Sequence, residues 1–290
     1  MIVDCHTQVW NTDTHLGRGA PIVAPAVQAD ETHHFQAAEP VDKAVVLAFK
    51  SRHLGAEIPN RFVADYVRRH ASKMVGFAGI DPNDRDWADD LRIAQEELHM
   101  KGVVISPTMQ NFHPTDTRVM RLYAECVERG MPLLFEQNHR NPSARMKFGQ
   151  PLLLDEVAHE FPGLQIIIAR LGFPWTHETI TLLGKHPNVY ANLAGLLAHP
   201  WLSYTALLAA HEYDVIDKLL FGSDFPYRSP AACIEALYSV NQFAHGTNLQ
   251  TVPREKLRGV VERDALEVLG IGNPTAPNSK PKTPIFVDDE

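Results

Sequence analysis

Short β-rich apolar runs alternate with longer amphipathic runs along almost the whole of this 290-residue chain, and no other feature limits the fold as much. Strands separated by helices predict βαβ units, which build a parallel sheet. Eight strand-like runs are present, at residues 2–5, 44–49, 75–80, 102–106, 132–135, 165–169, 189–193 and 219–222. Eight strands suit a closed barrel better than an open doubly wound sheet. We therefore predict an α/β protein with a single (β/α)₈ TIM-barrel domain.

The segments between the strands agree with this architecture. Helical periodicity covers residues 87–98, 118–128, 152–161 and 231–243. Gly130 follows the second of these helices, where a glycine commonly ends a helix. Neither a Gly-x-Gly-x-x-Gly nor a Gly-x-x-x-x-Gly-Lys-Ser/Thr motif follows any strand, which argues against a nucleotide-binding open sheet. The predicted barrel spans residues 1–271.

Two segments differ from the rest. Residues 11–40 show little periodicity and several Gly, Pro and His residues, so we predict a long loop after the first strand, at the end of the barrel where active sites form. Residues 272–290 are rich in Pro and polar residues, which is typical of a flexible tail. The alternative is an arm that packs through the apolar run at 285–287.

Charge and composition exclude several classes of partner. The net charge is −8 with no block of Lys or Arg, which disfavours nucleic acids and anionic membranes. No apolar run approaches the roughly 20 residues that span a bilayer, and no secretory signal pattern opens the sequence. Three widely spaced cysteines predict no disulfide framework and fit a reducing compartment. We expect a soluble cytoplasmic protein with a small-molecule substrate, and a homo-oligomer remains open.

Polar and ionisable residues follow nearly every predicted strand, which is where catalytic groups lie in this fold. A ring of such residues at the ends of apolar strands predicts a polar pocket at the mouth of the barrel. In chain order they are His6, Gln8, Lys50, Arg52, His53, Asp81, Ser106, Glu136, Gln137, Arg170, Asn192 and Asp224.

Several phrases resemble the amidohydrolase superfamily, in its amidohydrolase-2 branch of decarboxylases, lactonases and related hydrolases. The resemblance covers residues 1–271, and its specificity comes from the order and spacing of the phrases. They are Val3-Asp4-Cys5-His6-Thr7-Gln8, Phe77-Ala78-Gly79-Ile80-Asp81-Pro82, Met131-Pro132-Leu133-Leu134-Phe135, Arg170-Leu171-Gly172-Phe173-Pro174-Trp175, Asn188-Val189-Tyr190 and Phe221-Gly222-Ser223-Asp224-Phe225-Pro226.

The departures from the family pattern affect its metal-binding residues. Gln8, Glu136 and Arg170 stand where the resemblance implies histidines, whereas His6 and Asp224 match the family. The usual Lys and His are also absent from the fourth strand, residues 102–107. The resemblance thus implies a degenerate metal site.

One interpretation retains a metal ion. The resemblance implies a divalent ion that polarises the substrate or activates water. Here His6, Glu136 and Asp224 would hold it, with Gln8 as a weak oxygen ligand. One imidazole and two carboxylates suit weakly held Zn²⁺ or Mn²⁺.

The other interpretation requires no cofactor. Neighbouring strands place the permanent cation of Arg170 close to Glu136, where it attracts the carboxylate and repels a second cation. Arg170 would then take the electrostatic role of the ion. Asp224 would act as general base or orient water, and His6 would act in acid–base chemistry. Lys50 and Arg170 would hold a substrate carboxylate or an oxyanion. The predicted substrate-binding residues are Lys50, Arg52, His53, Gln137 and Asn192.

We expect a hydrolase that cleaves an ester, a lactone or a related bond in a small carboxylated substrate, with or without metal. A metal-dependent decarboxylase of the same family and a non-catalytic small-molecule-binding barrel are the alternatives. Each site residue also has a structural interpretation: Asp224 can cap a loop, His6 can be a hydrogen-bonded core histidine, and Glu136 with Arg170 can form a structural ion pair. Fold alone does not decide between these functions.

Overall fold

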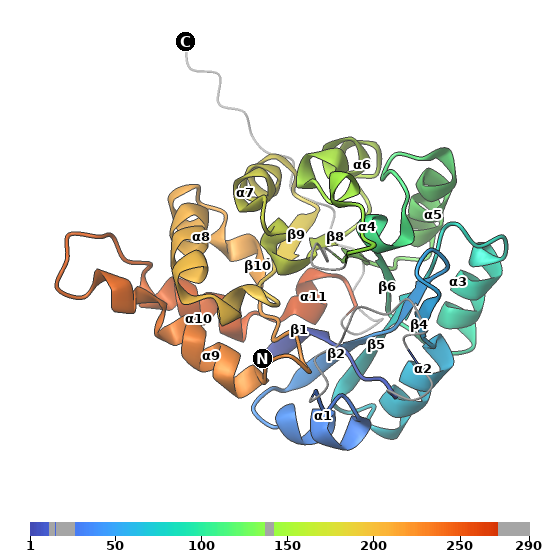
Figure 1. Cartoon of the computed structure of the whole chain (residues 1–290), viewed down its shortest axis with the longest axis horizontal. Coiled ribbons are helices and arrows are strands. Elements are labelled where there is room, and N and C mark those ends of the chain that lie inside the picture. The colour runs from blue at the N-terminus through green and yellow to red at the C-terminus, as the bar shows by residue number, and fades with distance from the viewer. Residues whose placement is uncertain (12–14, 16–26, 137–141, 272–290) are drawn as a thin grey trace, which may run out of the picture.

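A computed structural model describes residues 1–11, 15, 27–136 and 142–271 of the chain. Eight parallel strands lie side by side and curve into a nearly closed barrel (Figure 1). In spatial order they are β1 (Val3–Thr7), β2 (Lys43–Leu47), β5 (Met74–Gly79), β6 (Gly102–Ile105), β7 (Leu133–Phe135), β8 (Ile166–Ile168), β9 (Val189–Asn192) and β10 (Leu219–Leu220). The prediction of a (β/α)₈ barrel is confirmed.

The seam between the first and last strands closes through the backbone just beyond β10. Cys5 N donates to Phe221 O, Asp224 N donates to His6 O, and Gln8 N donates to Phe225 O. Beyond this two-residue strand the chain continues beside β1, and Thr7 forms a parallel bridge with Phe225. This pairing holds the segment that carries Asp224 directly against the segment that carries His6.

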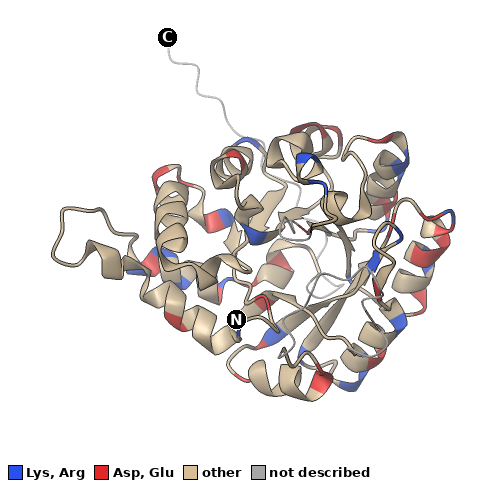
Figure 2. Ribbon diagram, viewed as in Figure 1, with Lys and Arg blue, Asp and Glu red and all other residues tan. Residues whose placement is uncertain are grey.

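Helices surround the barrel (Figure 1). The described α-helices are α1 (Glu31–Ala37), α2 (Asn60–Arg69), α3 (Trp87–Glu96), α4 (Pro107–Gln110), α5 (Thr117–Glu128), α6 (Leu154–Glu160), α7 (Thr176–Lys185), α8 (Pro200–Glu212), α9 (Pro230–Tyr238), α10 (Arg254–Glu262) and α11 (Ala265–Val268). Short 3₁₀ turns follow several strands, including η3 (Ala169–Gly172) and η4 (Leu196–Ala198). Acidic and basic positions are interspersed over these outer helices (Figure 2).

Helix α1 lies inside the 11–40 segment that the sequence predicts as a loop. Asp30 caps it by accepting hydrogen bonds from the backbone N–H groups of Thr32 and His33. His34 of this helix is buried, and its Nδ1 lies 2.7 Å from the hydroxyl of Tyr66. The 272–290 segment lies outside the described residues.

Two apolar layers stabilise the barrel. Side chains on the outer strand faces pack under the helices, while an inner cluster that includes Val45, Leu47 and Phe77 fills the barrel. Leu266 of α11 belongs to the inner cluster, so this helix packs over one end of it. The filled interior leaves the loops after the strands as the place for a binding site.

A small hairpin extends the second strand. It consists of β3 (Phe49–Ser51) and β4 (Ala56–Ile58), which pair antiparallel. A Cβ atom on Gly79 would lie 2.5 Å from the backbone of Phe49, so only glycine lets β5 pass this close. The hairpin carries Lys50 and leads to Arg52 and His53.

Among the described residues, none of the helices combines the length and apolar character needed to cross a membrane. Cys5, Cys126 and Cys233 are buried free thiols.

Candidate functional site

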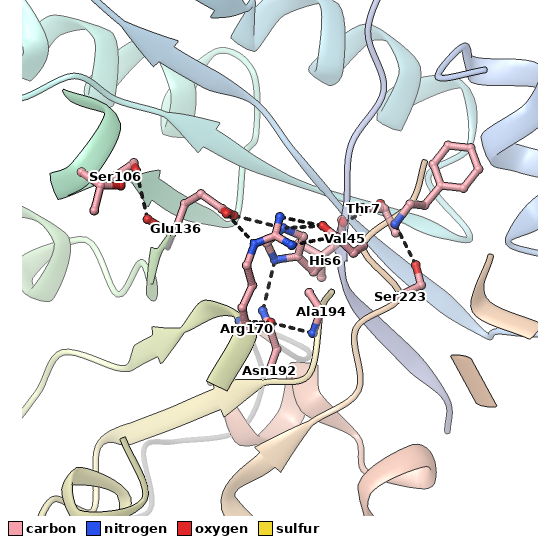
Figure 3. Close-up of polar contacts among 12 residues, drawn as sticks. His6, Thr7, Val45, Ser106, Glu136, Arg170, Asn192, Ala194 and Ser223 are labelled. Atoms are coloured by element: carbon pink, nitrogen blue, oxygen red, sulfur yellow. Dashed lines mark hydrogen bonds and ion pairs between the residues drawn. The ribbon is translucent and has the colours of Figure 1, made fainter. Parts of the chain in front are cut away.

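Four predicted residues meet at the carboxyl ends of the strands, and Figure 3 labels three of them, His6, Glu136 and Arg170. His6 lies on β1, Glu136 directly follows β7, Arg170 lies in η3 after β8, and Asp224 follows β10. His6 is 0% exposed, Glu136 2% and Asp224 5%. We call these four residues the quartet.

Arg170 joins the two carboxylates of the quartet. Its Nε donates to Glu136 Oε1 over 3.0 Å, and its Nη1 and Nη2 donate to Asp224 Oδ2 and Oδ1 over 2.5 and 2.8 Å. Parallel donation to both oxygens of one carboxylate is the strongest arrangement that a guanidinium makes. Three of the five N–H groups of Arg170 are therefore used within the protein.

This arrangement fixes the charges of the pair. Burial by itself would raise the pKa of Glu136, but the interactions with Arg170 and His6 outweigh it and lower that pKa to about 2. Burial would lower the pKa of Arg170, whereas Asp224 and Glu136 raise it above its usual range. Near neutral pH, Glu136 is therefore an ionised carboxylate and Arg170 a cation.

His6 faces both carboxylates. Its Nε2 lies 3.0 Å from Glu136 Oε2 and 3.7 Å from Asp224 Oδ1. Within the described part of the chain, neither His6 Nε2 nor Glu136 Oε2 has an aligned hydrogen-bond partner. Two buried polar atoms without aligned partners are costly unless a ligand or water satisfies them. Their proximity marks the place where a bound group would sit.

The backbone around the quartet adopts conformations that non-glycine residues rarely take. Arg170 has φ 59°, Leu171 φ 49° and Asp224 φ 67°. Such left-handed residues cost free energy and are concentrated at functional sites. Here they turn Arg170 and Asp224 toward each other at the ends of strands that are not neighbours. Gly195 itself has φ 69°, and an added Cβ there would clash with Arg170 Nη1, so a larger residue would both strain the backbone and displace the guanidinium.

Asn192 lies beneath the quartet, at the end of β9. Its Oδ1 accepts hydrogen bonds from the backbone N–H groups of Arg170 and Ala194, over 3.1 and 3.2 Å. Its Nδ2 lies 3.3 Å from His6 Nδ1. The side chain is 0% exposed, so its amide interacts with protein groups.

Lys50, Arg52 and His53 lie on the β3–β4 hairpin. Lys50 Nζ contacts carboxylate oxygens of Asp84 and Asp90, over 2.6 and 2.7 Å. Arg52 reaches Asp84 over 3.2 Å but leaves 58% of its side chain exposed. His53 is exposed, and its Nε2 lies 3.3 Å from the backbone oxygen of Ser143.

Gln137 and Gln8 complete the predicted set. Gln137 lies outside the described residues. Gln8 is half-buried, and its backbone N–H contributes to the closing seam. Among the described residues, no group of three or more His, Cys, Asp or Glu side chains is arranged to hold a metal ion.

Sequence reasoning did not identify two further groups near the site. Burial and the negative charge of Asp224 raise the pKa of Tyr227, which lies three positions beyond Asp224 in the same loop. Asp4, two positions before His6, is fully buried, and burial raises its pKa to about 6 although Ser223 and His6 donate hydrogen bonds to it. The spacing of Tyr227 from Asp224 is the one sequence signal that could have suggested it.

A model of the amidohydrolase family matches residues 3–271, which is almost the whole described chain. The chain belongs to the amidohydrolase family. It is an enzyme of that family, although the family alone does not specify its reaction. A sequence search among curated proteins finds no match.

Several solved structures share the barrel fold with this chain at low sequence identity. A TIM-barrel protein from Bordetella bronchiseptica is 19% identical, with a TM-score of 0.67 over 93% of this chain and 98% of that one. A "probable 2-pyrone-4,6-dicarboxylic acid hydrolase" from Acinetobacter baumannii, with citric acid bound, is 13% identical, with a TM-score of 0.66 over 93% and 99%. A dihydroxybenzoic acid decarboxylase from a Polaromonas species, with bound manganese and 2-nitroresorcinol, is 13% identical, with a TM-score of 0.65 over 94% and 97%.

Proposed function

We propose that this amidohydrolase hydrolyses an ester or lactone bond in a small carboxylated substrate without a divalent metal ion. The observation that carries the proposal is the guanidinium of Arg170, which bonds both carboxylates that would otherwise bind the ion. A permanent organic cation would thus supply the positive charge of this degenerate metal site.

The residues present do not fit a divalent ion. Catalytic zinc sites use three protein ligands, and only His6 Nε2 and Glu136 Oε2 lack aligned partners among the described atoms of the quartet. The next candidate, Asp224 Oδ1, already accepts a hydrogen bond from Arg170 Nη2. An ion placed there would also be repelled by the buried guanidinium.

The quartet can provide the groups that ester hydrolysis needs. Asp224 would orient a water molecule and take its proton as the water oxygen attacks the carbonyl carbon. The free N–H groups of Arg170, together with His6, would stabilise the negative charge on the carbonyl oxygen. The bond from the carbonyl carbon to the ester oxygen then breaks, and the proton passes to that oxygen. A lactone gives one hydroxy acid, whereas an acyclic ester gives a carboxylic acid and a separate alcohol.

The substrate carboxylate needs a cation outside the quartet, because two carboxylates and one guanidinium leave the quartet net negative when His6 is neutral. Lys50 is already shared between Asp84 and Asp90. Two other residues of the hairpin are better placed to bind a substrate carboxylate that enters from solvent. Arg52 has 58% of its side chain exposed, and His53 is also exposed. The similar fold of a protein described as a probable 2-pyrone-4,6-dicarboxylic acid hydrolase supports this choice of substrate.

The two alternative functions place different requirements on Arg170 and Asp224. A metal-dependent decarboxylase would require the guanidinium to leave the carboxylates before the ion enters; two structurally similar decarboxylases contain bound manganese. A non-catalytic binding barrel would need no proton acceptor, so loss of the Asp224 charge would leave ligand binding nearly intact.

Metal analysis and substrate screening test the proposal together. The protein is produced with added Zn²⁺ and Mn²⁺, purified without chelators, and its metal content per chain is measured. We expect a value near zero, and Arg170→His, which removes the cation and adds a ligand, should raise it. About one equivalent in the unaltered protein would contradict the proposal and favour the metal-dependent reaction.

Hydrolysis of a panel of carboxylated lactones and esters is then followed with and without chelator. We expect chelator-resistant turnover that Asp224→Asn reduces by at least about 100-fold, the usual scale for a general acid–base group. Asp155→Asn is the matched control, because Asp155 forms an outer ion pair with Lys185 and is 38% exposed. Equal turnover by the Asp224→Asn and Asp155→Asn variants would refute the role of Asp224.

A further inference from the structure

Asn192 has an amide whose orientation is set by its neighbours. Its Oδ1 lies 3.1 and 3.2 Å from two backbone N–H donors, those of Arg170 and Ala194. The reversed amide would place an NH₂ group against both donors, so the carbonyl oxygen must face them. Nδ2 of Asn192 therefore faces His6, as the contacts in Figure 3 show.

An amide NH₂ group can only donate. Because Asn192 Nδ2 lies 3.3 Å from His6 Nδ1, this ring nitrogen must offer its lone pair and carry no proton. In the neutral ring the proton then resides on Nε2, which faces Glu136 Oε2 at 3.0 Å and Asp224 Oδ1 at 3.7 Å. The three residues that determine this arrangement, His6, Asn192 and Glu136, are each at most 2% exposed as whole residues.

We infer that Asn192 is a positioning residue that holds His6 in the Nε2–H tautomer and thereby makes His6 a hydrogen-bond donor to the centre of the quartet. Asn192 acts through His6, because its own side-chain contacts are to the far nitrogen of that ring and to the backbone of Arg170 and Ala194. Through its Oδ1 it also holds the backbone of Arg170, so one buried amide orients both the imidazole and the guanidinium segment.

The consequence for catalysis rests on the proposed function. An Nε2–H group has no lone pair for a metal ion, but it can donate to the carbonyl oxygen of a bound ester beside the free N–H groups of Arg170. His6 then stabilises the oxyanion, and Asp224 remains the proton acceptor. The tautomer itself can be measured without any substrate, so it stands or falls separately from the proposed reaction.

The direct test is the state of the His6 ring in the full-length protein. Protein labelled with ¹⁵N-histidine is studied by long-range ¹H–¹⁵N correlation spectroscopy, which distinguishes a protonated from an unprotonated ring nitrogen. The His6 signals are those that disappear in His6→Gln. In the neutral form of the ring we expect a protonated Nε2 and an unprotonated Nδ1, and a neutral ring that carries its proton on Nδ1 would overturn the inference.

Asn192→Asp tests whether the amide is the cause. The aspartate keeps the shape of the side chain and one oxygen toward Arg170 and Ala194, but it replaces the donor that faces His6 with an acceptor. We expect His6 Nδ1 to become protonated in this variant. A fully folded variant with an unchanged His6 spectrum would show that Asn192 does not set the tautomer.

Asn188→Asp is the matched control. Asn188 precedes the same strand, β9, at its opposite end, and is only 4% exposed. Its Nδ2 donates to the backbone oxygens of Phe161 and Leu164, over 3.1 and 2.9 Å. This variant should lose stability but leave the His6 signals in place. If it moves them as Asn192→Asp does, the effect is a general disturbance of β9 and the inference fails.

Discussion

Two clusters at the mouth of the barrel contain the same charges, namely one cation between two carboxylates. Arg170 lies between Glu136 and Asp224, and Lys50 lies between Asp84 and Asp90. The three side chains of the first cluster are 17%, 3% and 8% exposed, whereas those of the second are 27%, 16% and 30% exposed. The first is held at strand ends, and the second joins a hairpin to the loop and helix after β5.

This difference shows that burial and donor geometry, more than charge, distinguish a candidate catalytic cluster from a structural one. The planar guanidinium donates in parallel to both oxygens of Asp224, which the ammonium of Lys50 cannot do. Water near the hairpin screens the Lys50 contacts, but the quartet is nearly dry, so each of its groups depends on its partners.

The largest effect is expected from Arg170→Met. Two buried carboxylates would lose their cation, and breaking a buried pair by removing one partner costs about 3–5 kcal/mol. We expect the free energy of unfolding, measured with urea at pH 7, to fall by this amount. Loss of less than about 1 kcal/mol would mean that the quartet is as well solvated as the Lys50 cluster.

The next effect concerns acid. Because the pKa of Glu136 is lowered from 4.5 to about 2, its ionisation stabilises the fold above pH 4.5, and this contribution disappears as the pH falls through 2. The free energy of unfolding should therefore lose about 2 kcal/mol of the Glu136 contribution by pH 3. Urea unfolding at pH 3 and pH 6 measures the difference.

The free energy of unfolding of the Glu136→Gln variant should fall less between pH 6 and pH 3 than that of the unaltered protein, by the same amount of about 2 kcal/mol. The other carboxylates titrate in both proteins and cancel in this comparison. Identical acid sensitivity of the two proteins would mean that Arg170 does not hold Glu136 in its ionised form.

The smallest effect is expected from Lys50→Met. Its pKa is raised by Asp84 and Asp90 against the opposing effect of burial, yet partly exposed pairs of this kind contribute only about 0–1 kcal/mol. Urea unfolding should therefore show a loss below about 1 kcal/mol, and 1 M NaCl should remove most of it. A loss that matches that of Arg170→Met would abolish the distinction between the two clusters.

The sequence by itself determined the barrel and the strand ends that carry the site. Alternating strands and helices, with polar residues after apolar runs, predict the fold and place His6, Glu136 and Arg170 at its mouth. The pairing of Glu136 with Arg170 also follows from the sequence, because consecutive strands are neighbours in a parallel barrel, and the structure confirms it at 3.0 Å. Hydrophobic periodicity and strand order predict these features because neither depends on how far a particular side chain extends.

Only the tertiary structure decided which partners each of these groups takes. Arg170 bonds Asp224 across the intervening β9, because left-handed turns at both residues direct the two side chains toward each other. The amide of Asn192 faces His6, and Lys50 forms ion pairs with Asp84 in the loop after β5 and with Asp90 in helix α3. These contacts depend on a few backbone angles and on the length of each side chain. Such quantities leave no periodic pattern in the sequence and become fixed only when the barrel closes.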